Sequence, residues 1–303
     1  MISLAMPTYN GGKYLREQLD SIYGQTMVPD EIVVVDDCST DNTIDILEEY
    51  KTSCGLKYYI NEKNLGYNKN FEKAIMLCSG DYILLCDQDD VWLPQKVEKC
   101  YNEIVKYPID TPALVSCFSS TDPNILITKK GKKLRSGDWR LNYTLYVSQG
   151  CTLMFNRFLK EEILPFPDSM MYDAYLGLAA SLIGNRWFIG EELMYYRIHQ
   201  ANSFQKNAST PVTKTLRRNL YKHVPLWFGY ERYRSLKYIR NLLHEKAIPS
   251  HLEYLNKIIS LYEVDAFKRL AILGSIKEIP LWHRIRSIVL LMIKVIFNIR
   301  DIV

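Results

Sequence analysis

The stretch EIVVVDDCSTDNTIDILEEY, residues 31–50, contains the structural unit from which the rest of the chain can be interpreted. Its first part, EIVVVD (31–36), is too continuously apolar to have a face in water, which is typical of a strand buried in a parallel sheet. Ile44, Leu47 and Tyr50 follow at the spacing of an amphipathic helix. A buried strand followed directly by such a helix predicts one βα unit.

The same alternation continues on both sides of this unit. Apolar runs that indicate strands occupy residues 2–7, 56–60 and 81–86. Between them, apolar residues recur at helical spacing, namely Leu15, Leu19, Ile22, Phe71, Ala74, Ile75 and Cys78. A later strand pair at 152–155 and 185–199 brackets a helix that opens at MYDAYLGLAASLIG. The pattern predicts an α/β fold with a Rossmann-like, doubly wound and mostly parallel sheet.

In such a sheet ligands bind beyond the carboxyl ends of the strands, so the residues at those ends carry the functional prediction. Three of the ends are PTYNGG, DDCSTDNT and DQDDVW, and two of the three contain neighbouring carboxylates. Residues two apart on a strand share a face, so we expect Asp87 and Asp89 to point the same way and to hold a hard cation such as Mg²⁺. The alternative is that Asp90 caps the helix that follows.

The acidic pair after the second strand has a different expected use. Asp36 and Asp37 close a buried strand, where the carboxylate of Asp37 can accept from a base imide N–H or from ribose hydroxyls. Ser39, Thr40 and Asp41 are residue types that cap a following helix. A calcium loop of the EF-hand type is excluded, because neither its glycine nor its final glutamate is in register.

Composition and cysteine usage restrict the class of protein. With 303 residues, 48% hydrophobic and 24% charged, the chain is long enough for one large domain or a domain with an appendage. Its seven cysteines form no CxxC pair and leave an odd one out, which predicts reduced thiols and a cytosolic protein. The sequence opens without a basic leader, and no apolar run reaches the roughly 18 to 20 residues of a spanning helix. Serine-hydrolase, P-loop and dinucleotide motifs are absent from the sequence.

The formal net charge of +4 is distributed unevenly. Residues 205–303 contain 18 Lys and Arg against 7 Asp and Glu, or +11, which leaves −7 for residues 1–204. A basic region of this kind suits an anionic partner, either nucleic acid or the cytoplasmic face of a membrane. The segment at 279–300 has the pattern of an interfacial helix, and packing on the first region is the equal alternative. Basic and aromatic residues at 226–240 suit stacking on single-stranded nucleic acid, but the acidic first region argues against that partner.

Six motifs then occur in one order and spacing, namely SLAMPTYNGGKYLREQLDSI, DEIVVVDDCSTDNT, NEKNLGYNKNFEKAI, GDYILLCDQDDVWLP, QGCTLMFNR and YRIHQANS. Together they resemble a family 2 glycosyltransferase with the GT-A fold, over roughly residues 1–204. The DQDDVW and YRxHxxN variants are most similar to bacterial rhamnosyltransferases that build capsule or cell-wall polysaccharide. We therefore expect a catalytic GT-A domain at 1–204 and a basic helical, membrane-associating region at 205–303.

The resemblance implies a set of donor-binding residues. Those expected around the nucleotide are Pro7, Thr8, Tyr9 and Asn10, with Asp37 reading the base. Those expected to line the donor pocket are Asn64, Gly66, Lys69 and Asn70. Asp87 is expected beside the ribose and the metal, and Asp89 on the metal itself, which is Mg²⁺ or Mn²⁺. The family more often has arginine at position 69, and lysine can serve only as a point charge there.

Two later residues complete the implied mechanism. Asp173 in MMYDAYLG matches the position of the family's catalytic base, although Tyr172 and Ala174 differ from the neighbours that are common in this branch. Its alternative role is that of a helix N-cap. His199 in YRIHQANS is expected on the metal or the phosphates, with an ordinary packed or surface histidine as the alternative.

The function that the resemblance implies is an inverting, metal-dependent sugar transfer. The favoured donor is dTDP-L-rhamnose, with a UDP-hexose as the alternative. The implied acceptor is a saccharide, carried on a polyprenyl diphosphate at the inner face of the cell membrane, and no nucleic acid is involved. The hypothesis of another class is a non-catalytic scaffold of the same fold at the membrane.

Overall fold

The computed structural model describes residues 1–121, 137–138, 149–199 and 230–263 of the chain. Internal contacts divide the chain into two compact units. The first comprises Met1–Trp139, Ser148–Ala180 and Gly184–Ile198, and the second comprises Arg140–Val147, Ser181–Ile183 and His199–Val303. The expected boundary at residue 204 lies outside the described residues.

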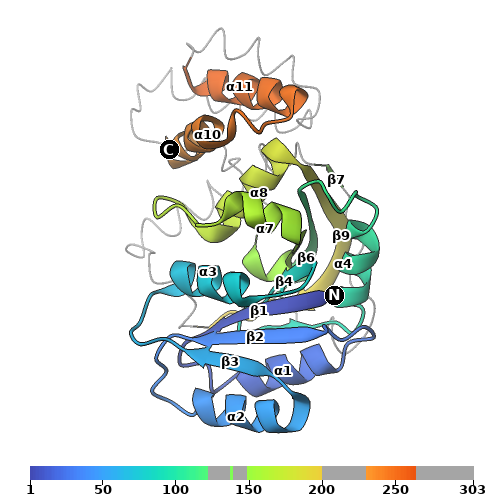
Figure 1. The fold of residues 1–303 in the computed structure, drawn as a ribbon, viewed down its shortest axis with the longest axis vertical. Helices are drawn as coiled ribbons and strands as arrows, with labels where there is room; N and C mark the ends of the chain where they lie inside the picture. The colour runs from blue at the N-terminus through green and yellow to red at the C-terminus, as the bar shows by residue number, and fades with distance from the viewer. Residues whose placement is uncertain (122–136, 139–148, 200–229, 264–303) are drawn as a thin grey trace. The chain divides into compact units, whose positions relative to one another are not determined.

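The first unit is built on one curled sheet (Figure 1), whose strand order is β3-β2-β1-β4-β8-β6-β9-β5, with β7 paired to β9. Its strands are β1 (Ile2–Thr8), β2 (Glu31–Asp36), β3 (Lys57–Ile60), β4 (Tyr82–Leu85), β5 (Val91–Trp92), β6 (Ala113–Ser120), β7 (Gly137–Asp138), β8 (Leu153–Asn156) and β9 (Asn185–Tyr195). The half formed by β3, β2, β1 and β4 is wholly parallel. Antiparallel β8 joins that half to β6, which in turn pairs in parallel with β9. The α/β architecture and the strands predicted at 2–7, 31–36, 56–60 and 81–86 are confirmed.

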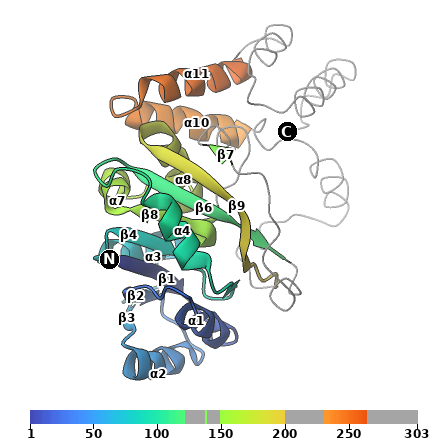
Figure 2. The same ribbon diagram turned by 90° about the vertical axis from the view of Figure 1, so that its right-hand side faces the viewer.

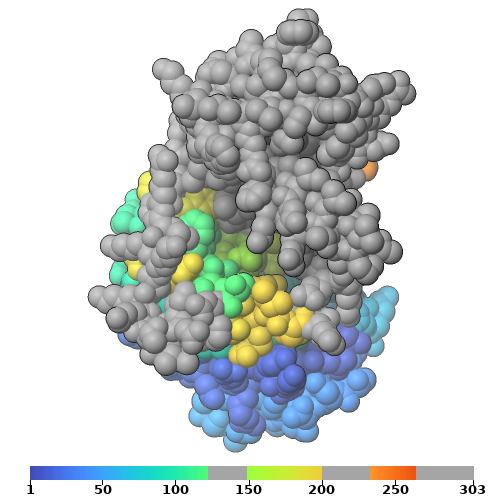
Figure 3. Space-filling view, turned by 180° about the vertical axis from the view of Figure 1, so that it is seen from behind, coloured from blue at the N-terminus to red at the C-terminus, as the bar shows by residue number. Residues whose placement is uncertain are grey.

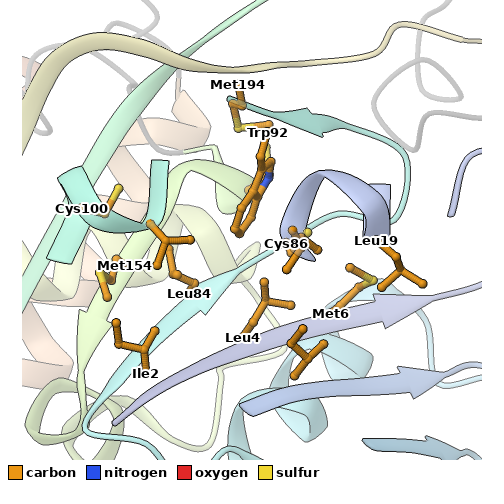
Figure 4. Packing of buried hydrophobic residues seen from close by; sticks show 14 of the residues in the cluster. Ile2, Leu4, Met6, Leu19, Leu84, Cys86, Trp92, Cys100, Met154 and Met194 are labelled. Atoms are coloured by element: carbon orange, nitrogen blue, oxygen red, sulfur yellow. The ribbon is translucent and has the colours of Figure 1, made fainter. Parts of the chain in front are cut away.

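Helices cover both faces of this sheet (Figure 2). They are α1 (Leu15–Tyr23), α2 (Thr43–Cys54), α3 (Tyr67–Leu77), α4 (Lys96–Ile104), α7 (Arg157–Ile163) and α8 (Tyr172–Ile183), with a 3₁₀ turn, η1, at Gly150–Thr152. One hydrophobic core joins α1, α2 and α4 to alternate residues of the strands. Leu4 and Met6 of β1, Leu84 of β4 and Met154 of β8 point into this layer (Figure 4). The opposite face of the sheet is covered by α3 and α7 (Figure 1).

Three elements differ from the sequence-based expectation. Strand β6 was not predicted, because its sequence ALVSCFSS alternates poorly, yet β8 and β9 both pair with it. Asp90 is followed by β5 rather than by a helix, and α4 begins only at Lys96 after Gln95. The interpretation of Asp90 as a helix cap is therefore wrong. The strand expected at 185–199 ends at Tyr195.

The described part of the second unit contains the helices α10 (Tyr230–Leu243) and α11 (Pro249–Glu263). They pack against each other through the stacked rings of Tyr233 and Tyr262, whose centroids are 5.3 Å apart, and the hydroxyl of Tyr233 donates to Glu263 at 2.8 Å. The segment at 279–300 that carries the interfacial pattern lies outside the described residues. Within the described residues, no helix combines the length and apolar character needed to cross a membrane.

Candidate active site

The loops after β1 and β4 are joined at the carboxyl edge of the sheet. The backbone N–H of Tyr9 donates to Oε1 of Gln88 at 2.9 Å, and Nε2 of Gln88 donates to the carbonyl of Tyr9 at 3.0 Å. Gly11 permits this contact, because a Cβ at that position would lie 2.2 Å from the same Oε1. Gln88 is a site residue that sequence reasoning missed, since nothing in the motif indicates that its amide pairs with a distant backbone.

Asp37 is buried at the end of β2 and organises the loop before α3. Its carboxylate accepts hydrogen bonds from Nδ2 of Asn61 at 2.8 Å, from the N–H of Leu65 at 2.7 Å and from the N–H of Gly66 at 2.8 Å. Gly66 has a φ of 80°, a left-handed conformation that favours glycine. Asp37 therefore has an architectural role that the sequence did not reveal, and its contact with a nucleotide base stays a prediction.

The other residues predicted to line the donor pocket have different degrees of access. Asn64 is exposed, and its Nδ2 donates to the carbonyl of Asp37 at 3.0 Å. Asn70 is buried, with its amide bonded to the carbonyl of Val35 at 2.9 Å and to Asn61 at 3.0 Å. The ammonium of Lys69 forms ion pairs with two carboxylates and donates to a backbone carbonyl, namely Asp168 at 3.1 Å, Glu72 at 3.3 Å and Phe166 at 3.3 Å. A phosphate contact of Lys69 stays a prediction.

The four residues predicted around the nucleotide lie at the end of β1. Pro7 and Thr8 are buried, and the hydroxyl of Thr8 donates to Asp36 at 2.8 Å. Tyr9 and Asn10 are exposed, with Asn10 in the left-handed region at a φ of 47°. The side-chain oxygen of Asn10 accepts from the N–H of Thr40 at 2.8 Å, which joins the loops after β1 and β2.

The acidic loop after β4 brings together a group of side chains that differs from the predicted pair. Residues 88–89 form a turn between β4 and β5, so the two-residue alternation of a strand does not apply to them. Among the described residues, potential ligand atoms of Asp87, Asp90 and Cys151 lie within 4.8 Å of one another. Asp89 is half-buried and is not a member of this group, and its role as a metal ligand stays a prediction.

The two carboxyls of this group are held in an unfavourable environment. Burial, followed by the charges of Asp90 and Asp89, raises the pKa of Asp87 well above its usual value. Burial and the charge of Asp89 raise the pKa of Asp90 to about 7. Oδ1 of Asp90 accepts from the N–H of Arg197 at 3.1 Å, whereas its Oδ2 is buried without a hydrogen-bond partner among the described residues. Close carboxyl oxygens and an orphaned buried acceptor fit a divalent cation.

Arg197 and Lys96 supply the positive charge next to this loop, and sequence reasoning missed both. Nε of Arg197 donates to the carbonyl of Asp89 at 2.9 Å, and its Nη2 donates to Glu17 at 2.6 Å. In the space-filling view, the yellow segment that follows β9 accordingly lies against the blue N-terminal residues (Figure 3). The buried ammonium of Lys96 donates to the carbonyl of Cys151 at 2.6 Å and lies 3.5 Å from the ring centroid of Trp92.

Asp173 lies in the first turn of α8 and shares an electrostatic environment with the acidic loop. It is buried, its carboxylate accepts from the N–H of Ala174 at 2.7 Å, and its charge contributes to the raised pKa of Asp87. The residue at the N-cap position is Met171, so the alternative that Asp173 is the cap is wrong. The predicted base and the predicted cation site are thus brought to one region from sequence positions far apart.

Asn68 is a further residue that sequence reasoning missed. Its Nδ2 donates to the carbonyl of Met170 at 3.1 Å, and its Oδ1 accepts from the N–H of Tyr172 at 2.7 Å. These bonds fix the backbone directly before Asp173 to the first turn of α3. A pocket of about 290 Å³ lies between the same two segments, lined by residues 65–68 and 168–171. Burial and the charge of Asp173 raise the pKa of Tyr67 in this lining.

His199 is half-buried and falls in the second compact unit. Its predicted contact with the metal or the phosphates therefore stays a prediction. All seven cysteines are free thiols, as expected from their spacing, and five of them are buried, namely Cys78, Cys86, Cys100, Cys117 and Cys151.

The family model described as glycosyl transferase family 2 matches residues 3–163. The dTDP-rhamnosyl transferase RfbG of Shigella flexneri is 30% identical over 226 residues, which cover 67% of this chain and 75% of the relative. Chondroitin synthase of Escherichia coli is 31% identical over 152 residues, half of this chain but only 21% of that protein.

Solved structures confirm the predicted GT-A fold. The structure of S. aureus TarS residues 1–349 in complex with UDP-GlcNAc has a TM-score of 0.60 at 19% identity, and the match covers 94% of this chain and 78% of that one. The mannosyltransferase PcManGT of Pyrobaculum calidifontis, in complex with GDP-Man and Mn²⁺, has a TM-score of 0.54 at 16% identity, covering 98% and 87%. At these identities the likeness extends to the fold alone.

Proposed function

Because the chain belongs to glycosyl transferase family 2, we propose that it is an inverting glycosyltransferase that moves L-rhamnose from dTDP-L-rhamnose to a saccharide acceptor. The observation that supports this activity most is the gathering of Asp87 and Asp90 at the carboxyl edge of the sheet, with the charge of Asp173 acting on the same region. A doubly wound sheet binds its ligands at this edge. A structural scaffold would not need two close carboxyls, one of them buried with an oxygen that has no hydrogen-bond partner among the described residues.

In the proposed reaction, Asp173 acts as the general base. Its carboxylate accepts the proton of the acceptor hydroxyl while that oxygen attacks the anomeric carbon. The bond from this carbon to the nucleoside diphosphate breaks on the opposite side, so the configuration inverts. Asp173 is buried and the backbone before it is held by Asn68, which supports the role because a base must come within roughly 2.6–3.2 Å of the proton's oxygen.

The nucleoside diphosphate of the donor is proposed to lie along the loops that follow β1, β2 and β4. Exposed Tyr9 and Asn10 border this region, and Asp37 fixes the loop that contains Asn64 and Gly66. A cation is proposed on the acidic loop, with Asp89 and His199 as further ligands. When bound, Mg²⁺ or Mn²⁺ supplies positive charge that balances the leaving diphosphate.

The choice of rhamnose rests on sequence similarity to a protein named as a dTDP-rhamnosyl transferase. A UDP-hexose is the second candidate, because a protein of the same fold is described in complex with UDP-GlcNAc. The acceptor is proposed to be a saccharide on a polyprenyl diphosphate. A polysaccharide product is supported by the name of one relative, the putative teichuronic acid biosynthesis glycosyltransferase TuaG of Bacillus subtilis, which is 35% identical over 100 residues.

The activity is tested by incubating the full chain with Mn²⁺, an acceptor saccharide and either dTDP-L-rhamnose or UDP-hexoses, and by measuring the nucleoside diphosphate released. Asp173→Asn should lower kcat by at least about a hundredfold, the usual effect of removing a general base. Asp89→Ala should abolish transfer while the circular dichroism spectrum stays unchanged. Asp45→Asn, on the exposed face of α2, is the matched control and should retain activity. Unchanged turnover in Asp173→Asn would exclude its role as the base.

We also propose that the basic C-terminal region binds the anionic inner face of the cell membrane, near the lipid-linked acceptor. The support is the excess of +11 charges in residues 205–303. The full chain should sediment with vesicles that contain anionic lipid and stay in solution with zwitterionic vesicles. Equal partitioning with both kinds of vesicle would contradict an electrostatic attachment. That result would leave the proposed transfer activity untouched, because the activity is measured separately.

A further inference from the structure

Cys151 lies where strand pairing brings a thiol to the acidic loop. It belongs to η1, directly before β8, and β8 runs antiparallel to β4, whose end leads into the acidic loop. The result is that Sγ of Cys151 and carboxyl oxygens of Asp87 and Asp90 lie within 4.8 Å of one another. Cys151 and Asp90 are each 1% exposed, whereas Asp87 is only half-buried.

A second observation at the same place indicates a ligand. Oδ2 of Asp90 is buried and accepts no hydrogen bond from an N–H or O–H group of the described residues, and the thiol of Cys151, a weak donor, is the side chain that interacts with this carboxyl. Leaving a buried carboxyl oxygen without a donor costs free energy, and a bound cation removes that cost. Lys96 supplies positive charge near Asp90, but its ammonium donates to the carbonyl of Cys151 and lies on the ring of Trp92.

We propose that Asp87, Asp90 and Cys151 form a cation site with one sulfur and two oxygen ligands, which binds thiophilic ions such as Zn²⁺, Cd²⁺ or Co²⁺ more tightly than Mg²⁺. Thiolate ligands select soft metals, whereas Mg²⁺ requires oxygen ligands. On binding, the metal–sulfur bond forms, the thiol S–H bond breaks and its proton passes to water. Nothing is oxidised or reduced in this step.

The geometry is compatible with a tetrahedral ion. Typical lengths of about 2.3 Å for Zn–S and about 2.0–2.2 Å for Zn–O correspond to ligand atoms about 3.5 Å apart. The ligand atoms of the three side chains already lie within 4.8 Å of one another, so each pair must close by at most about 1.3 Å. With three protein ligands, the fourth position of a tetrahedral ion is left for a small ligand. Water or a phosphate oxygen can occupy it.

This site gives the proposed glycosyltransferase a device that senses which metal is present, and in that respect it rests on the proposed function. Asp87 is shared between the two proposals, because it is also expected beside the ribose and the catalytic metal. A thiophilic ion on Cys151 therefore competes with Mg²⁺ for the acidic loop. The expected consequence is inhibition by Zn²⁺ or Cd²⁺ that excess Mg²⁺ relieves slowly or incompletely.

The direct test is a titration of the metal-free full chain with Co²⁺, followed by absorption spectroscopy. A thiolate ligand gives a sulfur-to-cobalt charge-transfer band in the near ultraviolet, which oxygen ligands alone do not give. The wild type should develop this band at one equivalent. Cys151→Ser should lose it, and Asp87→Asn should weaken Co²⁺ binding by at least about tenfold, as expected when a ligand is removed. A wild-type protein without the band overturns the proposal.

Cys54→Ser is the matched control, because Cys54 is an exposed thiol of α2, away from β8 and the acidic loop. The band should persist in this variant. If the band is lost, the thiolate ligand is Cys54 and not Cys151, and the proposal is overturned. A thermal melt shows whether Cys151→Ser is folded. If it is not, the band is sought in wild type after Cys54 and Cys38 are alkylated, and its disappearance then overturns the proposal. Metal binding is read here without any sugar donor, so a failure to transfer sugar leaves this result interpretable.

Discussion

Two pairs of acidic residues lie at the same edge of the sheet, one at the end of β2 and one after β4, and they are stabilised in opposite ways. The carboxylate of Asp36 accepts from Thr8 and from both the N–H and the hydroxyl of Ser39. The carboxylate of Asp37 accepts three further hydrogen bonds. The carboxyls of Asp87 and Asp90, in contrast, are close to each other and to Asp89, and their pKa values are raised.

The contrast indicates which acidic residues have a structural role at the site and which are suited to bind a ligand. Hydrogen bonds to a carboxylate stabilise its charged form, so the pair after β2 is complete without any other molecule. Among the described residues, Oδ2 of Asp90 has no hydrogen-bond partner, and a bound cation would supply the positive charge that the carboxyls of Asp87 and Asp90 need. In the described part of the chain, the carboxyls of Asp87 and Asp90 therefore receive less stabilisation from hydrogen bonds than those of Asp36 and Asp37.

The largest expected effect on stability comes from removing Asp37, one of the two carboxylates that are well supplied with hydrogen bonds. Asp37→Ala leaves the N–H groups of Leu65 and Gly66 and the amide of Asn61 without their acceptor, which should lower the free energy of unfolding by about 3 kcal/mol. Urea unfolding measures this loss. The surface variant Asp45→Ala is the control and should change stability by less than about 0.5 kcal/mol. A loss below about 1 kcal/mol for Asp37→Ala would mean that this carboxylate serves the ligand alone.

The second prediction concerns pH. Glu31, at the other end of β2, is a further carboxylate that hydrogen bonds stabilise. Burial opposes its ionisation, but hydrogen bonds from Ser3, Ser79 and Lys57 prevail and hold the pKa of Glu31 at about 2. A lowered carboxyl pKa stabilises the folded state above pH 4.5 and ceases to do so as pH falls toward 2. Glu31→Gln should therefore cost about 2 kcal/mol at pH 7 and less than half of that at pH 3.

Urea midpoints of wild type and Glu31→Gln at the two pH values measure this difference. Because Ser3 and Ser79 are present in both proteins, the change with pH isolates the charge of Glu31 from the loss of its shape. An equal cost at pH 7 and pH 3 would show that the carboxylate charge contributes nothing.

The smallest expected effect is an increase in stability, and it comes from removing the charge of Asp90 in the acidic loop. The pKa of Asp90, about 7, exceeds the roughly 3.9 expected in the unfolded chain, so the metal-free wild type loses stability as pH rises from about 4 through 7. Asp90→Asn removes that charge and should raise the free energy of unfolding by about 1 kcal/mol at pH 8, with a smaller gain at pH 5. Mn²⁺ should stabilise the wild type against heat and have little effect on the variant. If the metal-free variant were less stable than the wild type at pH 8, the charge of Asp90 would not destabilise the folded protein.

The alternation of buried strands and amphipathic helices was sufficient to predict the first half of the fold. EIVVVD and DYILLC are continuously apolar, and such runs have few alternatives to a strand covered on both faces. Strand β6 escaped prediction because ALVSCFSS becomes a strand through its pairing with β8 and β9, which are distant in sequence. Local pattern reveals local structure, and long-range pairing is invisible to it.

The sequence by itself determined the α/β class, the three acidic or polar loops at one sheet edge, and the resemblance that singled out Asp87, Asp89 and Asp173. Only the tertiary structure decided that a turn at residues 88–89 joins Asp87 to Asp90, and that Cys151 completes their group. It also decided that the carboxylate oxygens of Asp37 accept hydrogen bonds from backbone N–H groups of a neighbouring loop. The physical reason is that residue type reveals what a side chain can bind, whereas its actual partners depend on which segments the folded backbone brings together.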